Sequence, residues 1–250
     1  NLFVWLHPGE PARALNFASA VYGAVAVGLA TRLASRLVES VLAGAAAGLF
    51  LAFSYTFWSQ AITAEVYTLH LVIVGASLLA LVSWAGRPCV SRLALFYAIY
   101  ALGFGNHLSM ILLLPALVAF LLLHRHPGAA DPLRRPMIAM AAGIAAVAAL
   151  QYAWNLRGLW AVIEPPSSFG EAIGTFWFDV TKADWRETLV MNLSETGLQS
   201  RPSMYWFDLR QEFGVPGVAL AAIGLAYVSI RWPRRGIVLL LLYAANLGFA

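Results

Sequence analysis

Residues 66–85 read VYTLHLVIVGASLLALVSWA, a run of 20 residues without one Asp, Glu, Lys or Arg. A helix needs about 20 apolar residues to cross a bilayer core of about 30 Å. Unpaired backbone groups cost several kcal/mol each in hydrocarbon, and nothing here alternates with the two-residue period of a barrel strand. The stretch therefore predicts a membrane-spanning α-helix.

Further apolar stretches lie on both sides of this one. They occupy 14–31, 41–58, 93–105, 107–123, 137–154, 215–230 and 236–250. The chain of 250 residues is 61% hydrophobic and 11% charged, with a mean hydropathy of +0.74, which excludes an ordinary soluble domain. We therefore predict an all-α, polytopic membrane helix bundle of about eight spans embedded in a lipid bilayer, the fourth and the last span being short.

Arginine placement predicts which way the bundle faces, because short cytoplasmic loops are rich in Lys and Arg. Every second connection carries arginines: Arg32, Arg36, Arg87, Arg92, Arg125, Arg134, Arg135, Arg231, Arg234 and Arg235. The intervening connections carry most of the acidic residues: Glu10, Glu65, Glu164, Glu171, Asp179, Asp184, Glu187, Glu195, Asp208 and Glu212. The arginine-rich set is predicted to be cytoplasmic and the acidic set extracytoplasmic. The net charge of +4 is thus a topology signal rather than a nucleic-acid footprint.

The longest connection, 155–214, divides the chain into three predicted parts. Residues 1–154 form the N-terminal part of a transmembrane module, 155–214 an extracytoplasmic loop with short interfacial helices, and 215–250 further transmembrane helices. Tryptophans in the loop fit either an interfacial aromatic belt or stacking against sugar or lipid headgroups. They are Trp160, Trp177, Trp185 and Trp206. Because the chain starts without Met or a signal-peptide pattern and stops inside an apolar run, we expect a piece of a longer protein.

Soluble-enzyme chemistry finds little support in the sequence. The only cysteine, Cys89, cannot form an intrachain disulfide, and no histidine cluster stands at metal-ligand spacing, so no metal site is predicted. Glycine-rich phosphate loops and Ser-His-Asp motifs in a strand-to-helix context are also absent. Gly44 and Gly48 form a small-xxx-small pair, which predicts close packing of two membrane helices.

The stretch 57–70, FWSQAITAEVYTLH, joins two spans on the predicted outer side. In one interpretation Thr63 caps the following helix and leaves Glu65 in its first turn, where the helix dipole favours a negative charge. In the other, Glu65 and Tyr67, with His70 one turn further, line the mouth of the bundle and bind a ligand. A carboxylate at this depth is expected to face protein or water rather than lipid.

The second outer motif is GFGNH, residues 103–107, where two spans meet with almost no loop. Glycine and asparagine suit a tight turn because they tolerate left-handed backbone angles. His107, however, begins the next membrane helix, and a histidine there can hydrogen-bond an anion or exchange protons near neutral pH. Its predicted position on the same side as Glu65 favours a functional interpretation.

These motifs occur in an order and spacing that carries a family resemblance. The segments are Pro8-Gly9-Glu10-Pro11-Ala12-Arg13-Ala14-Leu15-Asn16, Trp58-Ser59-Gln60, Ala64-Glu65-Val66-Tyr67-Thr68-Leu69 and Gly105-Asn106-His107-Leu108. They resemble a membrane family catalogued as a domain of unknown function, whose animal relatives are protein O-mannosyltransferases. The resemblance covers about residues 1–225.

That family is similar to the GT-C superfamily of multi-span glycosyltransferases. The resemblance implies transfer of a mannose-like sugar from a polyprenyl-phosphate carrier to a protein or glycan acceptor on the extracytoplasmic face, without a tightly bound cofactor. The Asp-Ser-Gly-Glu-like and His-Pro-Pro-Gly segments expected from the family are absent. The catalytic base is therefore expected upstream of residue 1, and the chain alone is expected to be inactive. Its Ala, Leu and Arg usage with almost no Lys predicts a high-GC bacterial source, and we therefore expect a protein of the bacterial cytoplasmic (inner) membrane with an extracytoplasmic active face.

The resemblance also implies which residues bind the donor phosphate or sugar. Glu65, Tyr67, Asn106 and His107 match the outer motifs, and Trp58 and Gln60 precede them. Arg157 begins the long outer connection and is expected either to pair with a phosphate or to anchor the interface.

Two other functions stay open at this point. A transporter also carries polar residues within its membrane helices, but transporters usually show inverted repeats, and no clear repeat is present here. A non-catalytic scaffold would use the aromatic-rich connection as a protein-binding surface. The clustering of polar residues at one predicted surface favours chemistry there over passage across the membrane.

Overall fold

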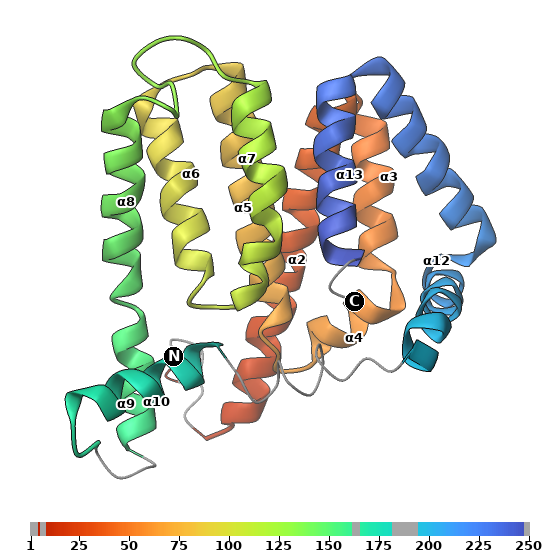
Figure 1. Ribbon diagram of the computed structural model, residues 1–250. Helices are drawn as coiled ribbons and strands as arrows, with labels where there is room; N and C mark the ends of the chain where they lie inside the picture. Colours follow the sequence, from red (N-terminus) through yellow and green to blue (C-terminus); the bar gives the residue numbers. More distant parts are fainter. Residues whose placement is uncertain (1–4, 6–8, 162–165, 182–194, 248–250) are drawn as a thin grey trace. The chain divides into compact units, whose positions relative to one another are not determined.

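The computed structural model describes residues 5, 9–161, 166–181 and 195–247, and every regular element among them is helical (Figure 1). Helices α2 to α8 are α2 (Pro11–Val38), α3 (Val41–Ala52), α4 (Tyr55–Ile62), α5 (Tyr67–Gly86), α6 (Val90–Gly103), the 3₁₀ helix η1 (Leu108–Leu113), α7 (Leu114–Leu123) and α8 (Arg135–Ala149). They are followed by α9 (Tyr152–Trp160), α10 (Phe169–Thr181), α12 (Glu195–Arg231) and α13 (Pro233–Leu247). The all-α prediction is confirmed.

The chain forms two compact units. The first unit contains residues 1–148 and 219–250, and the second unit contains residues 149–218. The two units do not correspond to the two sides of a membrane. The predicted parts 1–154, 155–214 and 215–250, with their membrane sides, therefore stay a prediction.

Membrane-spanning capacity is concentrated in a few helices. By length and composition, the described residues contain 4 candidate spans, or up to 5 if one bent helix pair counts as a span. The four are Pro11–Val38, Tyr67–Gly86, Arg135–Gly158 and Arg201–Arg231. All eight predicted apolar stretches are largely helical where described, but several are shorter than a bilayer core. The 14 residues of α6, for example, make a helix of about 21 Å.

The predicted span 41–58 is the clearest difference from expectation. It divides into α3 and α4, which are bent by 64° relative to each other. The break falls at Phe53 and Ser54, where Ser54 is extended and its hydroxyl donates to the carbonyl of Leu51 at 3.0 Å. A serine that hydrogen-bonds nearby backbone offers an alternative to the helix, which explains the interruption.

The core of the first unit lies between α5, α6, η1 and α7. Trp84 at the end of α5 is fully buried, as is Leu93 of α6, while Phe96 is 2% exposed. Met110 of η1 and Leu117 of α7 complete the interior of this group. These large apolar side chains fix the relative positions of α6 and the α6–η1 turn, which carries part of the site described below.

Helices α2 and α3 pack together through glycine. The turn between them uses Glu39 in the left-handed region, at φ 57° and ψ 33°, and Ser40 then caps α3 by accepting from the N–H of Ala43 at 3.2 Å. A Cβ added to Gly44 would lie 2.6 Å from the carbonyl oxygen of Thr31 and against the Ser35 hydroxyl. A Cβ on Gly48 would meet the Thr31 hydroxyl. The predicted close-packing role of both glycines is confirmed.

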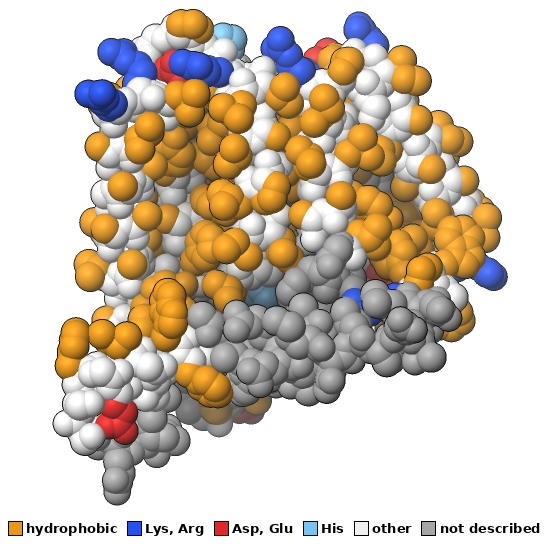
Figure 2. Space-filling view, viewed as in Figure 1, with side chains coloured by type: hydrophobic (Ala, Val, Ile, Leu, Met, Phe, Trp, Pro, Cys, Tyr) orange, Lys and Arg blue, Asp and Glu red, His pale blue; other side chains and the backbone are white. Residues whose placement is uncertain are grey.

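The arginines of the predicted cytoplasmic connections gather at one end of the first unit, which we call the arginine end (Figure 2), whereas Arg13 lies at the start of α2, at the other end. Two of these arginines connect helix ends directly. Arg235 donates to the carbonyl of Leu37 at 2.6 Å and pairs with Glu39 at 2.9 Å, and Arg92 donates to the carbonyl of Ser83 at 2.8 Å. The face of the molecule shown in Figure 2 carries many hydrophobic side chains below the arginine end, as expected of a surface that faces lipid.

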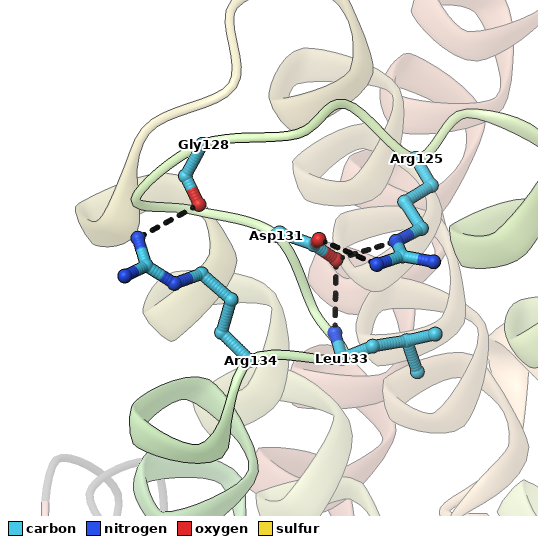
Figure 3. Close-up of polar contacts among 5 residues, drawn as sticks. All are labelled: Arg125, Gly128, Asp131, Leu133 and Arg134. Carbon is cyan, nitrogen blue, oxygen red and sulfur yellow. Dashed lines mark hydrogen bonds and ion pairs between the residues drawn. The ribbon is translucent and has the colours of Figure 1, made fainter.

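The α7–α8 loop at the arginine end is organised by one buried carboxylate (Figure 3). Asp131, 4% exposed, accepts two hydrogen bonds of 2.8 Å from the guanidinium of Arg125 and one of 3.1 Å from the N–H of Leu133. Arg134 donates to the carbonyl of Gly128 at 3.2 Å. The hydrogen bonds from Arg125 hold the pKa of Asp131 below its ordinary value.

In the second unit, the described helices are α9, α10 and the first part of α12. Ser168 begins α10 by accepting from the N–H of Glu171 at 3.2 Å, and Glu171 accepts from the hydroxyl of Ser167 at 2.6 Å. Gly214 interrupts α12 at φ 65° and ψ 167°, just before the predicted span 215–230. This backbone conformation is essentially restricted to glycine. Trp160, Trp177 and Trp206 are exposed, whereas Trp185, Glu164, Asp184 and Glu187 lie outside the described residues.

The glycine contact between α2 and α3 yields a stability prediction. Gly44→Ala should destabilise the protein by about 1–3 kcal/mol, because the added methyl group meets backbone that cannot move aside. The control is Gly28→Ala in α2, where nothing lies within 4 Å, and which should leave stability unchanged or slightly raised. Thermal unfolding in detergent measures both, and equal midpoints for the two variants would contradict the packing described.

The buried carboxylate of the α7–α8 loop yields a pH prediction. Asp131→Asn should lower the unfolding temperature at neutral pH, because the ion pair with Arg125 is lost. A carboxylate with a lowered folded-state pKa stabilises the protein above its unfolded-state pKa of about 4. That stabilisation is lost as the pH falls through the lower folded-state pKa. The difference between wild type and variant should therefore persist above about pH 4 and shrink below it; a difference that is constant down to strong acid would contradict this assignment.

Candidate functional site

At the end of the first unit opposite the arginine end, two non-helical connections meet polar side chains. We call this the polar end, and it includes the α4–α5 connection and the α6–η1 turn. The hydroxyl of Ser19, buried in α2, accepts from the N–H of Glu65 at 3.3 Å and lies 3.4 Å from the carbonyl of the same residue. Gly23, one turn later in α2, allows α4 to pack closely, because a Cβ at this position would lie only 3.1 Å from the Cβ atom of Ala61. Helix α2 thus positions the α4–α5 connection.

Glu65 precedes α5 rather than lying in its first turn. Thr63 does not cap α5, as the first interpretation predicted; its hydroxyl donates to the carbonyl of Ser59 at 3.0 Å and ends α4. Helix α5 begins only at Tyr67, without a side-chain cap. The Glu65 carboxylate is exposed and has no hydrogen bond or ion pair within the described part of the chain. The predicted Thr63 cap and the placement of Glu65 in the first turn are therefore wrong, and the Glu65 carboxylate is available to a ligand.

Asn106 joins the two outer motifs. Its amide nitrogen donates to the carbonyl of Val66 at 3.3 Å, which ties the α6–η1 turn to the start of α5. The turn itself is built from successive backbone hydrogen bonds, from Asn106 and His107 to the carbonyl of Gly103. Neither Gly105 nor Asn106 adopts the left-handed backbone conformation that was expected for this tight turn. Asn106 is used here for its side-chain amide, not for its backbone freedom.

His107 lies at the centre of the polar end. Its ring centroid is 5.8 Å from that of Tyr67 and 5.1 Å from that of His70. Its Nδ1 atom is 2.7 Å from the hydroxyl of Ser109 and accepts from the N–H of Ser109 at 3.2 Å. The same hydroxyl is 3.2 Å from Nε2 of His70. The predicted residues Tyr67 and His107 are therefore neighbours, joined by His70 and Ser109.

Ser109 is a site residue that the sequence analysis missed. A single serine two residues after a histidine gives no signal on its own, because its hydroxyl reaches both rings only through the short 3₁₀ turn. His70 lies one turn beyond Tyr67 in α5, and this spacing brings both residues to the same end of the helix. Tyr67 remains 46% exposed, so the group is open on one side.

Trp58 and Gln60 lie on α4, beside this group in sequence but with different surroundings. The Trp58 ring stacks on Phe53 with 6.4 Å between centroids and an interplanar angle of 10°. The side-chain oxygen of Gln60 is buried without a hydrogen-bond partner among the described residues, as are Oγ1 of Thr68 and Nδ1 of His70. All three atoms are enclosed by protein and are closed to a ligand in this conformation, so a role for Gln60 in binding stays a prediction.

Arg157 belongs to the second unit. Its guanidinium lies 5.3 Å from the ring centre of Trp154, a cation–π contact on α9. It also lines a shallow apolar hollow with Leu156 and Trp160. These contacts fit an interface anchor, and phosphate pairing by Arg157 stays a prediction. Within the described residues, His, Cys, Asp and Glu side chains form no group of three that could hold a metal ion.

Comparison with known proteins identifies the family. The family described as "Protein O-mannosyl-transferase TMEM260 N-terminal domain" matches residues 1–131. This is more than half of the 250 residues, and it contains both outer motifs but not Arg157. No match was found among curated proteins or among solved structures. The chain belongs to the family of the protein O-mannosyl-transferase TMEM260 N-terminal domain.

Proposed function

We propose that this chain is part of a membrane glycosyltransferase that takes a mannose-like sugar from a polyprenyl-phosphate carrier and transfers it to a protein or glycan acceptor on the extracytoplasmic face. The observation that carries the proposal is the grouping of Tyr67, Asn106 and His107 at the polar end, inside the region matched by an O-mannosyl-transferase family. The end opposite the arginines is the predicted extracytoplasmic end.

The chemistry of the polar end suits a phosphate-linked sugar. His107 and Asn106 bring N–H groups, which can donate to phosphate oxygens as negative charge develops on the leaving group. The Glu65 carboxylate accepts hydrogen bonds from sugar hydroxyls and would repel the phosphate, so we assign Glu65 to the sugar. Tyr67, half exposed, offers a ring face to the sugar or to the first isoprene unit.

The catalytic base is a separate requirement. Removal of the acceptor proton needs a carboxylate or comparable base within hydrogen-bond reach of the attacking hydroxyl. None of the described residues is assigned to this role, and we propose that the base lies outside residues 1–250. The first unit would then supply donor binding, and the bilayer would supply the route by which the lipid carrier reaches the polar end.

Substitution at the polar end should reduce transfer without loss of the folded protein. In the full-length protein, Glu65→Gln and His107→Ala are each expected to lower kcat/KM for the lipid-linked donor by about 10- to 100-fold, because each removes hydrogen bonds to charged or sugar groups. The measurement is transfer of labelled sugar from polyprenyl-phosphate to acceptor peptides in membranes.

Matched controls separate this effect from a general loss of charge or aromatic ring. Glu10→Gln removes an exposed carboxylate that pairs with Arg13 at the start of α2, and His126→Ala removes an exposed histidine of the α7–α8 loop. Both control variants should transfer sugar at the wild-type rate. Full transfer by Glu65→Gln and His107→Ala would overturn the site, and absence of transfer by the wild type with any lipid-linked donor would favour a transporter or scaffold.

A further inference from the structure

The hydrogen bonds around His107 determine which of its ring nitrogens carries the proton. Neutral histidine has one N–H donor and one acceptor nitrogen, and the partners of one nitrogen decide the tautomer. At His107, Nδ1 faces the backbone N–H of Ser109 at 3.2 Å, and a backbone N–H can only donate. Nδ1 of His107 must therefore be an acceptor, which leaves the proton on Nε2.

The hydroxyl of Ser109 then has only one consistent orientation. Because Nδ1 of His107 is an acceptor, the Ser109 hydroxyl donates to it across 2.7 Å. The hydroxyl oxygen in turn accepts from Nε2–H of His70 across 3.2 Å. The chain of hydrogen bonds runs in one direction, from His70 through Ser109 to His107.

The surroundings of His70 support the same direction independently. Nδ1 of His70 is buried and has no hydrogen-bond partner among the described residues. In the direction derived above this atom is an acceptor with an unused lone pair. In the reverse direction it would carry a buried N–H without a partner, which is the costlier and rarer arrangement.

We propose that Ser109 is a positioning residue: its backbone N–H fixes His107 as the neutral tautomer with its proton on Nε2, and its hydroxyl, held by His70, anchors the ring. The role of that proton rests on the proposed function: Nε2–H donates a hydrogen bond to a phosphate oxygen of the lipid carrier, and no proton is transferred. His107 acts as an oriented hydrogen-bond donor rather than as a general acid. His70 and Ser109 are part of the site but do not contact the lipid-linked sugar. The Nε2–H donor would be worth most as charge builds on the departing phosphate.

The tautomer can be measured without any transfer reaction. The full-length protein, labelled with ¹⁵N-histidine in nanodiscs, is observed at about pH 8, where an ordinary imidazole is neutral, and His107→Gln identifies the resonances. The expected result is an unprotonated Nδ1 and a protonated Nε2 at His107. A protonated Nδ1 at His107 would overturn the inference, whatever the activity of the protein.

Addition of polyprenyl phosphate to the same sample tests the role of the proton. A shift of the Nε2–H resonance of His107 on addition is expected. An unchanged resonance together with the expected tautomer would overturn the phosphate contact of the proposed function, while the assignment of Ser109 as the residue that sets the tautomer would stand.

Ser109 variants provide the kinetic test. Ser109→Ala should raise KM for the donor about 10-fold with a smaller change in kcat, because the His107 ring loses its anchor. Ser109→Thr keeps the hydroxyl and should restore KM to within about threefold of wild type. The control Ser77→Ala removes a buried hydroxyl of α5 that has no partner among the described residues, and should leave KM unchanged. Equal KM values for the Ala and Thr variants of Ser109 would contradict a role for the hydroxyl.

Discussion

The whole structure depends on one constraint, that backbone N–H and C=O groups within a bilayer must find partners in the protein. Long helices satisfy it locally, and α2 and α5 are of this kind. At several places in the described part of the chain where it leaves a helix, a polar side chain provides the missing hydrogen bond. Ser54 donates to Leu51 at the α3–α4 break, Ser19 bonds to Glu65, and Asn106 donates to Val66.

This constraint explains why the candidate site lies where it does. The polar end has short connections close to apolar helices, so it needs Ser, Asn and His side chains to satisfy the backbone. The same side chains then have further hydrogen-bonding capacity for a ligand. His107 caps η1 with Nδ1, which leaves Nε2 for a hydrogen bond to a ligand. At the arginine end the equivalent task falls to charged groups such as Arg235 and Asp131, and that end resembles an ordinary solvated loop region.

Much of this could be predicted from the sequence, because apolar length and glycine spacing are local signals. The helical stretches follow from apolar length, and the close contact of α2 with α3 at Gly44 and Gly48 follows from glycine spacing. The break at Ser54 could not be foreseen, since the flanking residues are as apolar as any span. The roles of Thr63, Asn106 and Ser109 depend on which carbonyl or ring lies nearby in space, and no spacing rule encodes that. The family resemblance placed Tyr67 and His107 in one site, and the structure supplied the residue that joins them.

Donor binding is proposed for the polar end of the first unit. A photoactivatable polyprenyl-phosphate sugar, cross-linked to the full-length protein in membranes and mapped by mass spectrometry, tests it most directly. Labelled peptides that contain Tyr67 or residues 105–109 are expected, with less label when unmodified donor competes. Label confined to the arginine end, for example to residues 124–134, would contradict it.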